Sequence, residues 1–338
     1  MWWIYPLYIV ALVAMVYLSI KLGDLVDLLD KKSKVSGAFI GSVLLGAVTS
    51  LPELFTSISS VLFVNNPELV IGDILGSDIF DIGALVVLTF IFARHFFESK
   101  LNSKLHLLNI GVLLVMYGLA LYAVFAPAEW QLMLGDINVI SPIIFIGYIA
   151  LLILSPKEAD EEKEESDSKL TVKQILVLFS ICAVLLIGVS IGITFLTDLI
   201  VKEIPWLGAS VGGAILLGVA TSIPEIISTA HLFKLRNYDA GFGNIIGSCT
   251  FNYAIISLAD FLSWQAINGS VVASRGIWIS TQNSQLLTLF GLFSALLLGG
   301  FILIKSYTKQ IKGVKSSFIY SGIVAALITT LYILSLVL

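Results

Sequence analysis

Two short stretches, VTSLPE at 48–53 and ATSIPE at 220–225, place a glutamate and two hydroxyl residues inside segments that are otherwise apolar. Residues three and four apart share one face of a helix, so Ser50 and Thr49 are expected to lie beside Glu53. The residues in the same places of the second stretch are Thr221, Ser222 and Glu225. Each stretch therefore gathers hydroxyl and carboxylate oxygens, which are ligands for a cation.

Each stretch also contains a proline. Pro52 has no N–H for the carbonyl oxygen of Val48, and Pro224 likewise frees the carbonyl of Ala220. We expect each helix to be kinked near the middle of the membrane, with one carbonyl oxygen left open. Such an oxygen is a further ligand for a cation.

A second polar motif follows each stretch: GDILGSDIFDIG at 72–83 and GNIIGSCTFNYA at 243–254. Polar residues recur every four positions in both motifs, which places them on one arc of a helix. They are Asp73, Ser77 and Asp81 in the first motif and Asn244, Ser248 and Asn252 in the second. All of these ligands offer oxygen, so the expected ion is hard: Ca²⁺, Na⁺ or Mg²⁺.

Other residues of these motifs have expected roles away from the ion. The glycines are expected to permit close helix packing; they are Gly72, Gly76, Gly243 and Gly247. Asp78 points away from the arc and has no assigned role. Asp73 and Asp260 lie nearer helix ends, where hydration is expected.

The carboxylates need a counter-charge. An ionised carboxylate inside the bilayer costs several kcal/mol, on the order of 3 or more, unless it is paired or hydrated. No lysine or arginine lies inside a predicted span to pair with Glu53, Glu225 or Asp81. One Ca²⁺ or a few Na⁺ would neutralise most of this negative charge. The positive charge of Ca²⁺ and Na⁺ bound together would exceed it. Mutually exclusive occupancy is what ion exchange requires.

The elements that carry these residues are predicted to be membrane helices. The chain of 338 residues is 58% apolar and only 12% charged, which excludes a water-soluble domain. Ten apolar runs of spanning length are predicted. They cover residues 3–20, 37–64, 69–93, 105–125, 137–155, 174–200, 208–233, 240–263, 284–304 and 316–337.

The two halves of the chain repeat each other. Thr49 aligns with Thr221 and Glu53 with Glu225 at an offset of 172 residues. Five spans per half is an odd number, so the second copy enters the membrane from the opposite side. The sequence thus predicts an all-α integral membrane protein of ten transmembrane helices in two inverted-topology repeats of five. The predicted parts are a first repeat at 1–155, an acidic cytoplasmic linker at 156–173 and a second repeat at 174–338.

Basic residues predict the orientation. Seventeen of the 19 lysines and arginines fall in alternate loops, leaving Lys202 and Arg275 for the other face. Because basic loops stay in the cytoplasm, both termini are expected outside. The six tryptophans support this assignment, since all fall at the predicted outer boundary. They are Trp2, Trp3, Trp130, Trp206, Trp264 and Trp278.

The doubled motifs resemble the two α-repeats of the sodium/calcium exchangers in the cation/Ca²⁺ exchanger superfamily. The resemblance implies four central ligands: Glu53, Asp81, Glu225 and Asn252. It also implies a set of neighbouring ligands: Thr49, Ser50, Ser77, Thr221, Ser222, Ser248 and backbone oxygens near Gly46 and Gly218. Family members move Na⁺ inward and Ca²⁺ outward by alternating access, with the first and sixth helices sliding as gates.

This chain departs from the family pattern in two respects. Val48 and Ala220 stand where glycine commonly precedes the Thr-Ser pair. Prokaryotic relatives usually have asparagine in the first repeat and aspartate in the second, whereas Asp81 and Asn252 are exchanged here. The two positions together still hold one aspartate, but it lies in the first repeat instead of the second. Ion selectivity and stoichiometry are therefore left open.

Na⁺/Ca²⁺ antiport is the leading hypothesis, and two alternatives remain. Ca²⁺/H⁺ exchange on the same scaffold is the nearest, because buried carboxylates can hold protons; proton-coupled relatives usually carry G-N-x-x-E rather than T-S-x-P-E. An intramembrane aspartyl protease using Asp73 or Asp81 would not explain two copies of T-S-x-P-E.

The remaining expectations follow from the transporter hypothesis. Its substrates are Ca²⁺ and Na⁺, its surroundings the lipid bilayer, and its location is multi-pass in the cell membrane. No cofactor, nucleic acid or obligate protein partner is expected.

Overall fold

The computed structural model describes residues 3–62, 68–99, 101–135, 137–155, 168–203, 213–266, 277–278 and 282–308, with 323, 326, 327 and 330. Helices dominate these residues, and the chain divides into two compact units. Unit 1 comprises 1–52 and 156–247, and unit 2 comprises 53–155 and 248–338. Each unit draws on both halves of the sequence.

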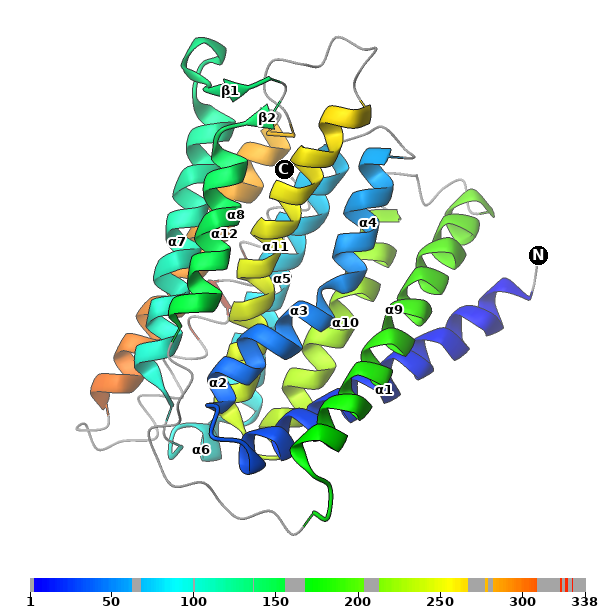
Figure 1. Cartoon of the computed structure of the whole chain (residues 1–338), viewed down its shortest axis with the longest axis vertical. Coiled ribbons are helices and arrows are strands. Elements are labelled where there is room, and N and C mark those ends of the chain that lie inside the picture. The colour runs from blue at the N-terminus through cyan, green and yellow to red at the C-terminus, as the bar shows by residue number, and fades with distance from the viewer. Residues whose placement is uncertain are drawn as a thin grey trace. The chain divides into compact units, whose positions relative to one another are not determined.

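Unit 1 is built on two long helices that run side by side (Figure 1). They are α1 (Ile4–Lys32) and α9 (Val172–Glu203). The shorter elements of the unit are α2 (Gly37–Phe39), the π-helix η1 (Ile40–Leu45), α3 (Gly46–Thr49) and α10 (Gly213–Lys234). The first part of α11 (Tyr238–Ala266) completes it. The core of unit 1 is a cluster of aliphatic side chains from these helices, including Leu22, Val26, Leu186 and Leu232.

Unit 2 contains the helices that follow Pro52 and the rest of α11. They are α4 (Leu51–Leu62), α5 (Glu68–Ile91), α6 (Ala93–Phe96), α7 (Ser103–Phe125), α8 (Ile140–Leu154) and α12 (Gln282–Thr308). Between α7 and α8 lie a 3₁₀ turn, η2 (Ala128–Trp130), and a hairpin of β1 (Met133–Leu134) and β2 (Ile137–Asn138). The hairpin is antiparallel, with Met133 opposite Asn138. Its turn contains Gly135 at φ +65°, where glycine is favoured.

Helices occupy the first nine predicted spans. Among the described residues, six helices are long and apolar enough to cross a membrane, and the bent pair Gly37–Thr49 with Leu51–Leu62 makes a seventh. The apolar α8 is shorter, starting at Ile140 because the β-hairpin occupies the predicted start at 137. The tenth span, 316–337, lies outside the described residues except for 323, 326, 327 and 330. The count of ten and the inverted repeat stay predictions.

α1 is longer than predicted, continuing past residue 20 to Lys32. Its added turns carry acids that meet polar partners within unit 1. The Asp24 carboxylate lies 2.7 Å from His231 Nε2, and Asn237 donates to Asp27 and Asp30 at 3.1 and 3.0 Å. An apolar-run criterion ends a span at the first charged residues, so it could not find this extension.

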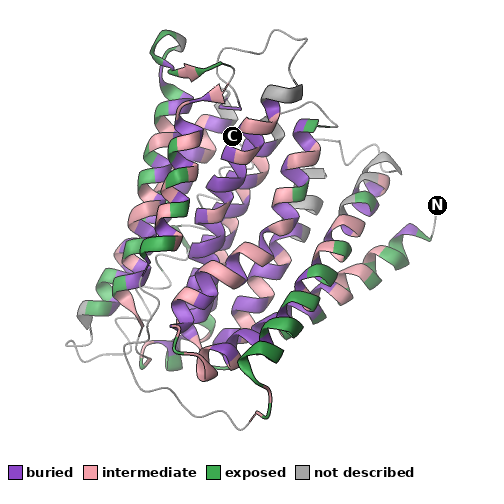
Figure 2. Ribbon diagram, viewed as in Figure 1, coloured by how far each residue is buried: buried purple, intermediate pink, exposed green. Residues whose placement is uncertain are grey.

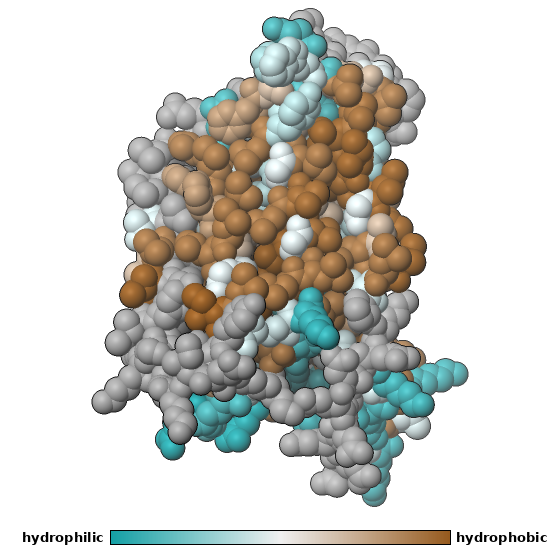
Figure 3. All heavy atoms as spheres, turned by 90° about the vertical axis from the view of Figure 1, so that its left-hand side faces the viewer, coloured by the Kyte–Doolittle hydropathy of each residue, from teal (hydrophilic) through white to brown (hydrophobic). Residues whose placement is uncertain are grey.

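One face of unit 2 is strongly apolar. Figure 3 shows a broad hydrophobic surface on the side where α7, α8 and α12 lie in Figure 1, with hydrophilic residues gathered toward the ends. Exposed apolar side chains on these helices include Val115, Ile146, Ile153 and Phe293. Such a surface suits contact with lipid tails, as expected of a multi-pass membrane protein.

Two motif helices, α5 and α11, are the most buried of the six described spanning helices (Figure 2). In the most apolar stretch of each helix, 78% of the α11 residues are buried, compared with 28% of the α9 residues. In unit 2, α8 covers α11 through aromatic pairs: Phe145 with Phe261, whose ring centroids are 5.9 Å apart, and Tyr148 with Phe251, at 5.6 Å. α11 is therefore held rigidly, which suits a helix that must position polar ligands.

Asp260 near the end of α11 is buried, which corrects the expectation that it is hydrated. Its carboxylate accepts the Ser141 hydroxyl at 2.6 Å and the backbone N–H groups of Asn138 and Ile277 at 3.1 and 2.7 Å. Trp278 is also buried, and it donates to the Ser141 hydroxyl oxygen at 2.8 Å, so its ring packs against protein and is not exposed; its predicted place at the outer boundary stays a prediction. This acid has a structural role, because it ties Asn138, Ser141 and Ile277 to α11 within unit 2.

Two motif glycines allow close approach of backbones in unit 1. A Cβ at Gly247 would overlap the Ser42 carbonyl, and one at Gly243 would overlap the Ala38 carbonyl. The packing role predicted for these two is confirmed. For Gly72 and Gly76, no described atom lies within 4 Å of an added Cβ.

This asymmetry gives a test of stability. Gly247→Ala should destabilise the protein by about 1–3 kcal/mol, because the Ser42 backbone must move to admit the methyl group. The measurement is thermal unfolding of the purified protein in detergent. Gly76→Ala is the matched control and should not lower the unfolding temperature. Equal effects of the two substitutions would contradict this account.

Candidate ion-binding site

The first polar stretch lies at a break between two helices. Ser36 starts α2 by accepting the backbone N–H of Phe39 at 3.3 Å. Ser50 leaves the helical conformation at φ −88° and ψ 10°, and the helix axes on its two sides differ by 41°. Pro52 falls in the first turn of α4, where its missing N–H leaves no helix bond unmade. The predicted kink is confirmed here.

Glu53 also lies in the first turn of α4. The N-terminal end of a helix carries partial positive charge, which favours a carboxylate at this place. The break thus sets Thr49 and Ser50 at the end of one helix and Glu53 at the start of the next.

The second stretch behaves differently, because α10 continues through Pro224 without a break. The predicted kink is confirmed for the first copy, whereas the one at Pro224 stays a prediction. Side-chain donors act on the α10 carbonyls beside this proline: the Ser228 hydroxyl donates to Pro224 O at 2.6 Å, and Asn244 Nδ2 donates to Glu225 O at 3.1 Å.

In unit 1, Ser50, Thr49 and Asn244 cluster around Glu225, which is 1% exposed. The Ser50 hydroxyl donates to Glu225 Oε1 at 3.1 Å. Glu225 Oε2 is buried and accepts no hydrogen bond from the described residues. None of the ion pairs in the described part of the chain involves Glu225. This oxygen is thus available to a cation.

In unit 1, the Asn244 side chain forms hydrogen bonds with residues of both α3 and α10. Its Nδ2 donates to Ser228 Oγ at 3.0 Å and Thr229 Oγ1 at 2.9 Å as well as to Glu225 O, while its Oδ1 accepts the Thr49 hydroxyl at 3.3 Å. Predicted as a member of the ligand arc, Asn244 instead has its amide engaged with its neighbours. It fixes the backbone of α10 at Glu225 and the end of α3 at Thr49.

In unit 2, a second cluster surrounds Glu53, which is 1% exposed. The Ser77 hydroxyl of α5 donates to Glu53 Oε1 at 3.4 Å. Asn252 of α11 is equally buried, and its Nδ2 donates to Asp78 Oδ1 at 2.8 Å. Asp78, which sequence reasoning set aside, is therefore a direct partner of a predicted ligand. The signal for it was present, since an acid inside a membrane segment is functional by default.

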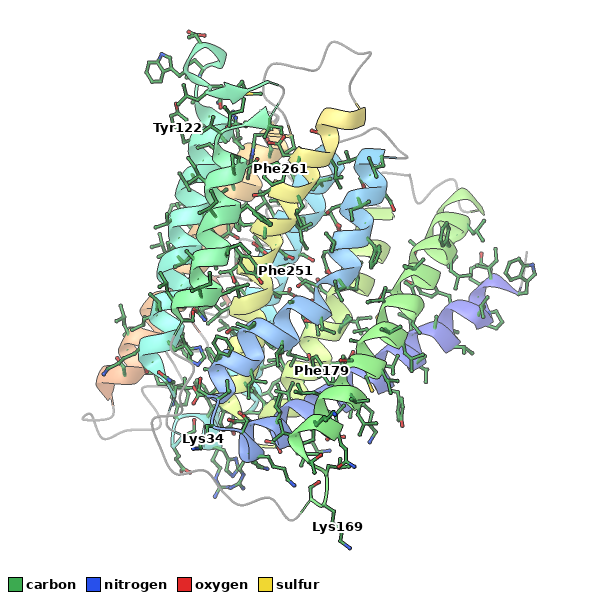
Figure 4. All side chains as sticks on the ribbon, viewed as in Figure 1. Lys34, Tyr122, Lys169, Phe179, Phe251 and Phe261 are labelled. Carbon is green, nitrogen blue, oxygen red and sulfur yellow. The ribbon has the colours of Figure 1, made fainter. Side chains whose placement is uncertain are left out.

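The other predicted ligands are placed as follows. Asp81 is buried on α5, Thr221 and Ser222 are buried on α10, and Ser248 is buried on α11. Gly46 begins α3, where its carbonyl accepts the Ser50 N–H at 3.2 Å, and Gly218 lies within α10. Figure 4 draws the side chains on these helices and labels Phe251 and Phe261 on α11.

Acidic groups alone do not make a metal site here. Within the described ranges, no three His, Cys, Asp or Glu side chains gather closely enough to hold a metal ion. The predicted ligands also offer hydroxyl, amide and backbone oxygens, and such mixed oxygen sets suit Na⁺ and Ca²⁺.

Comparison with known proteins is consistent with this chemistry. The chain matches the family model described as sodium/calcium exchanger protein over residues 3–155 and 173–338. An uncharacterized membrane protein of Methanocaldococcus jannaschii is 28% identical over 216 residues, covering 63% of this chain and 67% of that protein.

Solved structures of the sodium-calcium exchanger NCX_Mj have a similar fold. One soaked with 2.5 mM Na⁺ and 0.1 mM Ca²⁺ has a TM-score of 0.70 at 17% identity, covering 97% of this chain and 96% of that one. Another, soaked with zero Na⁺ and Ca²⁺, has a TM-score of 0.66 at 19% identity, covering 99% and 98%.

The role of Asn244 can be tested by stability. Asn244→Ala should destabilise the ion-free protein by about 1–3 kcal/mol, because it leaves buried partners on α3 and α10 without their hydrogen bonds. Thermal unfolding in detergent measures this. Ser180→Ala is the control, since that exposed hydroxyl bonds only the carbonyl of Leu176 in its own helix. An unchanged unfolding temperature for Asn244→Ala would refute the assignment.

Proposed function

The chain belongs to the sodium/calcium exchanger protein family, and from this premise we propose that it exchanges Na⁺ for Ca²⁺ across a membrane by alternating access. The family and its solved neighbours are secondary transporters, not enzymes. The observation that carries the proposal is the buried Glu225, with one oxygen held by Ser50 and the other unpartnered among the described residues.

We propose that the residues expected from the sequence to be ligands bind the transported ions. The proposed ligands are Glu53, Asp81, Glu225, Asn252, Thr49, Ser50, Ser77, Thr221, Ser222, Ser248 and the carbonyls near Gly46 and Gly218.

Exchange follows from the charge of this proposed site. One Ca²⁺ or a few Na⁺ would neutralise most of the charge on the carboxylates proposed for this site, and simultaneous binding of both ions would leave excess positive charge in a low-dielectric interior. Each ion therefore displaces the other. The NCX_Mj structures, which concern extracellular ion exchange in that protein, were soaked with Na⁺ and Ca²⁺ at varied concentrations.

We further propose the inverted repeat and the orientation expected from sequence, with both termini outside the cell membrane. The distribution of basic residues over alternate loops supports this orientation. The gates would be α1 and α9, which pack along each other and expose apolar residues such as Val13 and Val184.

Removal of either glutamate charge tests the proposal. Glu53→Gln and Glu225→Gln should each reduce Na⁺-driven ⁴⁵Ca²⁺ uptake in liposomes to background, because a neutral amide cannot balance a bound cation. Glu98→Gln, at an exposed acid, should keep wild-type flux. Near-normal uptake by a correctly folded Glu225→Gln protein would refute the proposed site.

The coupling ion is tested separately. In liposomes loaded with Na⁺, Ca²⁺ uptake should require the outward Na⁺ gradient and should persist when the pH gradient is abolished. Na⁺, K⁺ and H⁺ gradients are imposed one at a time, with Ca²⁺ or Mg²⁺ offered outside. Uptake that needs a pH gradient and ignores Na⁺ would favour Ca²⁺/H⁺ exchange instead.

A further inference from the structure

Asp78 is a buried acid outside the proposed ligand set. It lies on α5 in unit 2 and is 0% exposed. Its Oδ1 accepts Asn252 Nδ2 at 2.8 Å, and its Oδ2 accepts the Tyr117 hydroxyl at 3.1 Å. The Cys249 thiol is a third hydrogen-bonding neighbour. Side chains of three helices, α5, α7 and α11, therefore meet at this carboxylate.

The carboxylate decides which end of the Asn252 amide faces it. An ionised carboxylate only accepts hydrogen bonds, whereas an amide group has a donor end and an acceptor end. In the structure, the nitrogen of Asn252 faces Asp78 at 2.8 Å and its oxygen points away.

The outward-facing oxygen is left available. Asn252 Oδ1 is buried and accepts no hydrogen bond from the described residues. A buried amide oxygen without a donor is unfavourable by about 1–3 kcal/mol, which a cation would relieve. If the amide turned over, its N–H groups would face the cation and repel it.

The surroundings hold this arrangement in place. The Tyr117 and Tyr253 rings meet edge to face at a centroid distance of 5.0 Å, and both are 0% exposed. Asp78 directly follows Ser77, whose hydroxyl donates to Glu53. The pair of Asp78 and Asn252 thus adjoins the residues proposed to bind the ion.

We propose that Asp78 is a positioning residue that holds the Asn252 amide with its oxygen toward the transported cation. This inference rests on the proposed ion site, in which Asn252 is a ligand. The proposal explains how the uncharged Asn252 amide can act as a cation ligand. Asp78 fixes the orientation of the amide and polarises the amide oxygen. Partners that orient a metal ligand are typically worth about 10–100-fold in metal affinity.

The test compares one substitution in two backgrounds. Asp78→Leu in the wild type should raise the Kd for Ca²⁺ about 10–100-fold, because Asn252 can then turn over. In an Asn252→Asp background, Asp78→Leu should raise the Kd by less, since a carboxylate offers oxygen in either orientation. The Kd is measured by calorimetric titration of Ca²⁺ into the purified, Na⁺-free protein, with folding followed by size exclusion and thermal unfolding.

The outcomes separate positioning from other roles. An equal fold-change in both backgrounds, or none in the wild type, would overturn the proposal, because general charge or packing effects do not depend on residue 252. Asp260→Asn is the control for a structural acid: it should lower the unfolding temperature while leaving the Kd unchanged.

Failure of the proposed exchange would be recognised separately. If the wild type binds Ca²⁺ but a Na⁺ gradient does not drive its uptake, exchange with Na⁺ is refuted and the binding comparison still decides the role of Asp78. If the wild type does not bind Ca²⁺ at all, both proposals are overturned.

Discussion

The structure depends on one electrostatic constraint: a carboxylate buried among apolar helices needs a partner of opposite charge. Glu225 and Glu53 are each 1% exposed, and the helices around them are apolar enough to cross a membrane. Hydroxyl groups of Ser50 and Ser77 satisfy one oxygen of each acid but supply no charge. In the proposed function a transported cation supplies this charge and then leaves, so an arrangement that is costly in a static protein becomes useful in a transporter.

The fold meets this constraint with neutral residues that hold the acids in place. In unit 1, Gly243 and Gly247 let α11 lie against the backbone of α2 and η1, and Asn244 then reaches both Thr49 and the backbone at Glu225. In unit 2, aromatic pairs with α8 hold α11 while Asn252 meets Asp78. The ligands are therefore positioned largely by hydrogen bonds and close packing, as an oxygen site for a hard ion requires.

The sequence could predict the helices and the pairs of polar residues, because hydrophobic runs and four-residue spacing are local patterns. The resemblance implied that Thr49, Ser50 and Glu225 are ligands of one site, but it did not predict the hydrogen bonds of Ser50 to Glu225 and of Thr49 to Asn244. It could not predict that α10 passes Pro224 unbroken, nor that Asn244 is fully engaged, since both depend on neighbours distant in sequence. Asp78 was missed because helical phase placed it off the arc, while the tertiary fold set Asn252 against it.

Competition between the two ions tests the central claim most directly. Equilibrium binding of ⁴⁵Ca²⁺ to the purified protein would be measured as Na⁺ is increased at constant ionic strength with choline as the replacement cation. The account predicts that Na⁺ displaces bound Ca²⁺ completely, because both ions neutralise the same buried carboxylates. Ca²⁺ binding that is unaffected by saturating Na⁺ would contradict it.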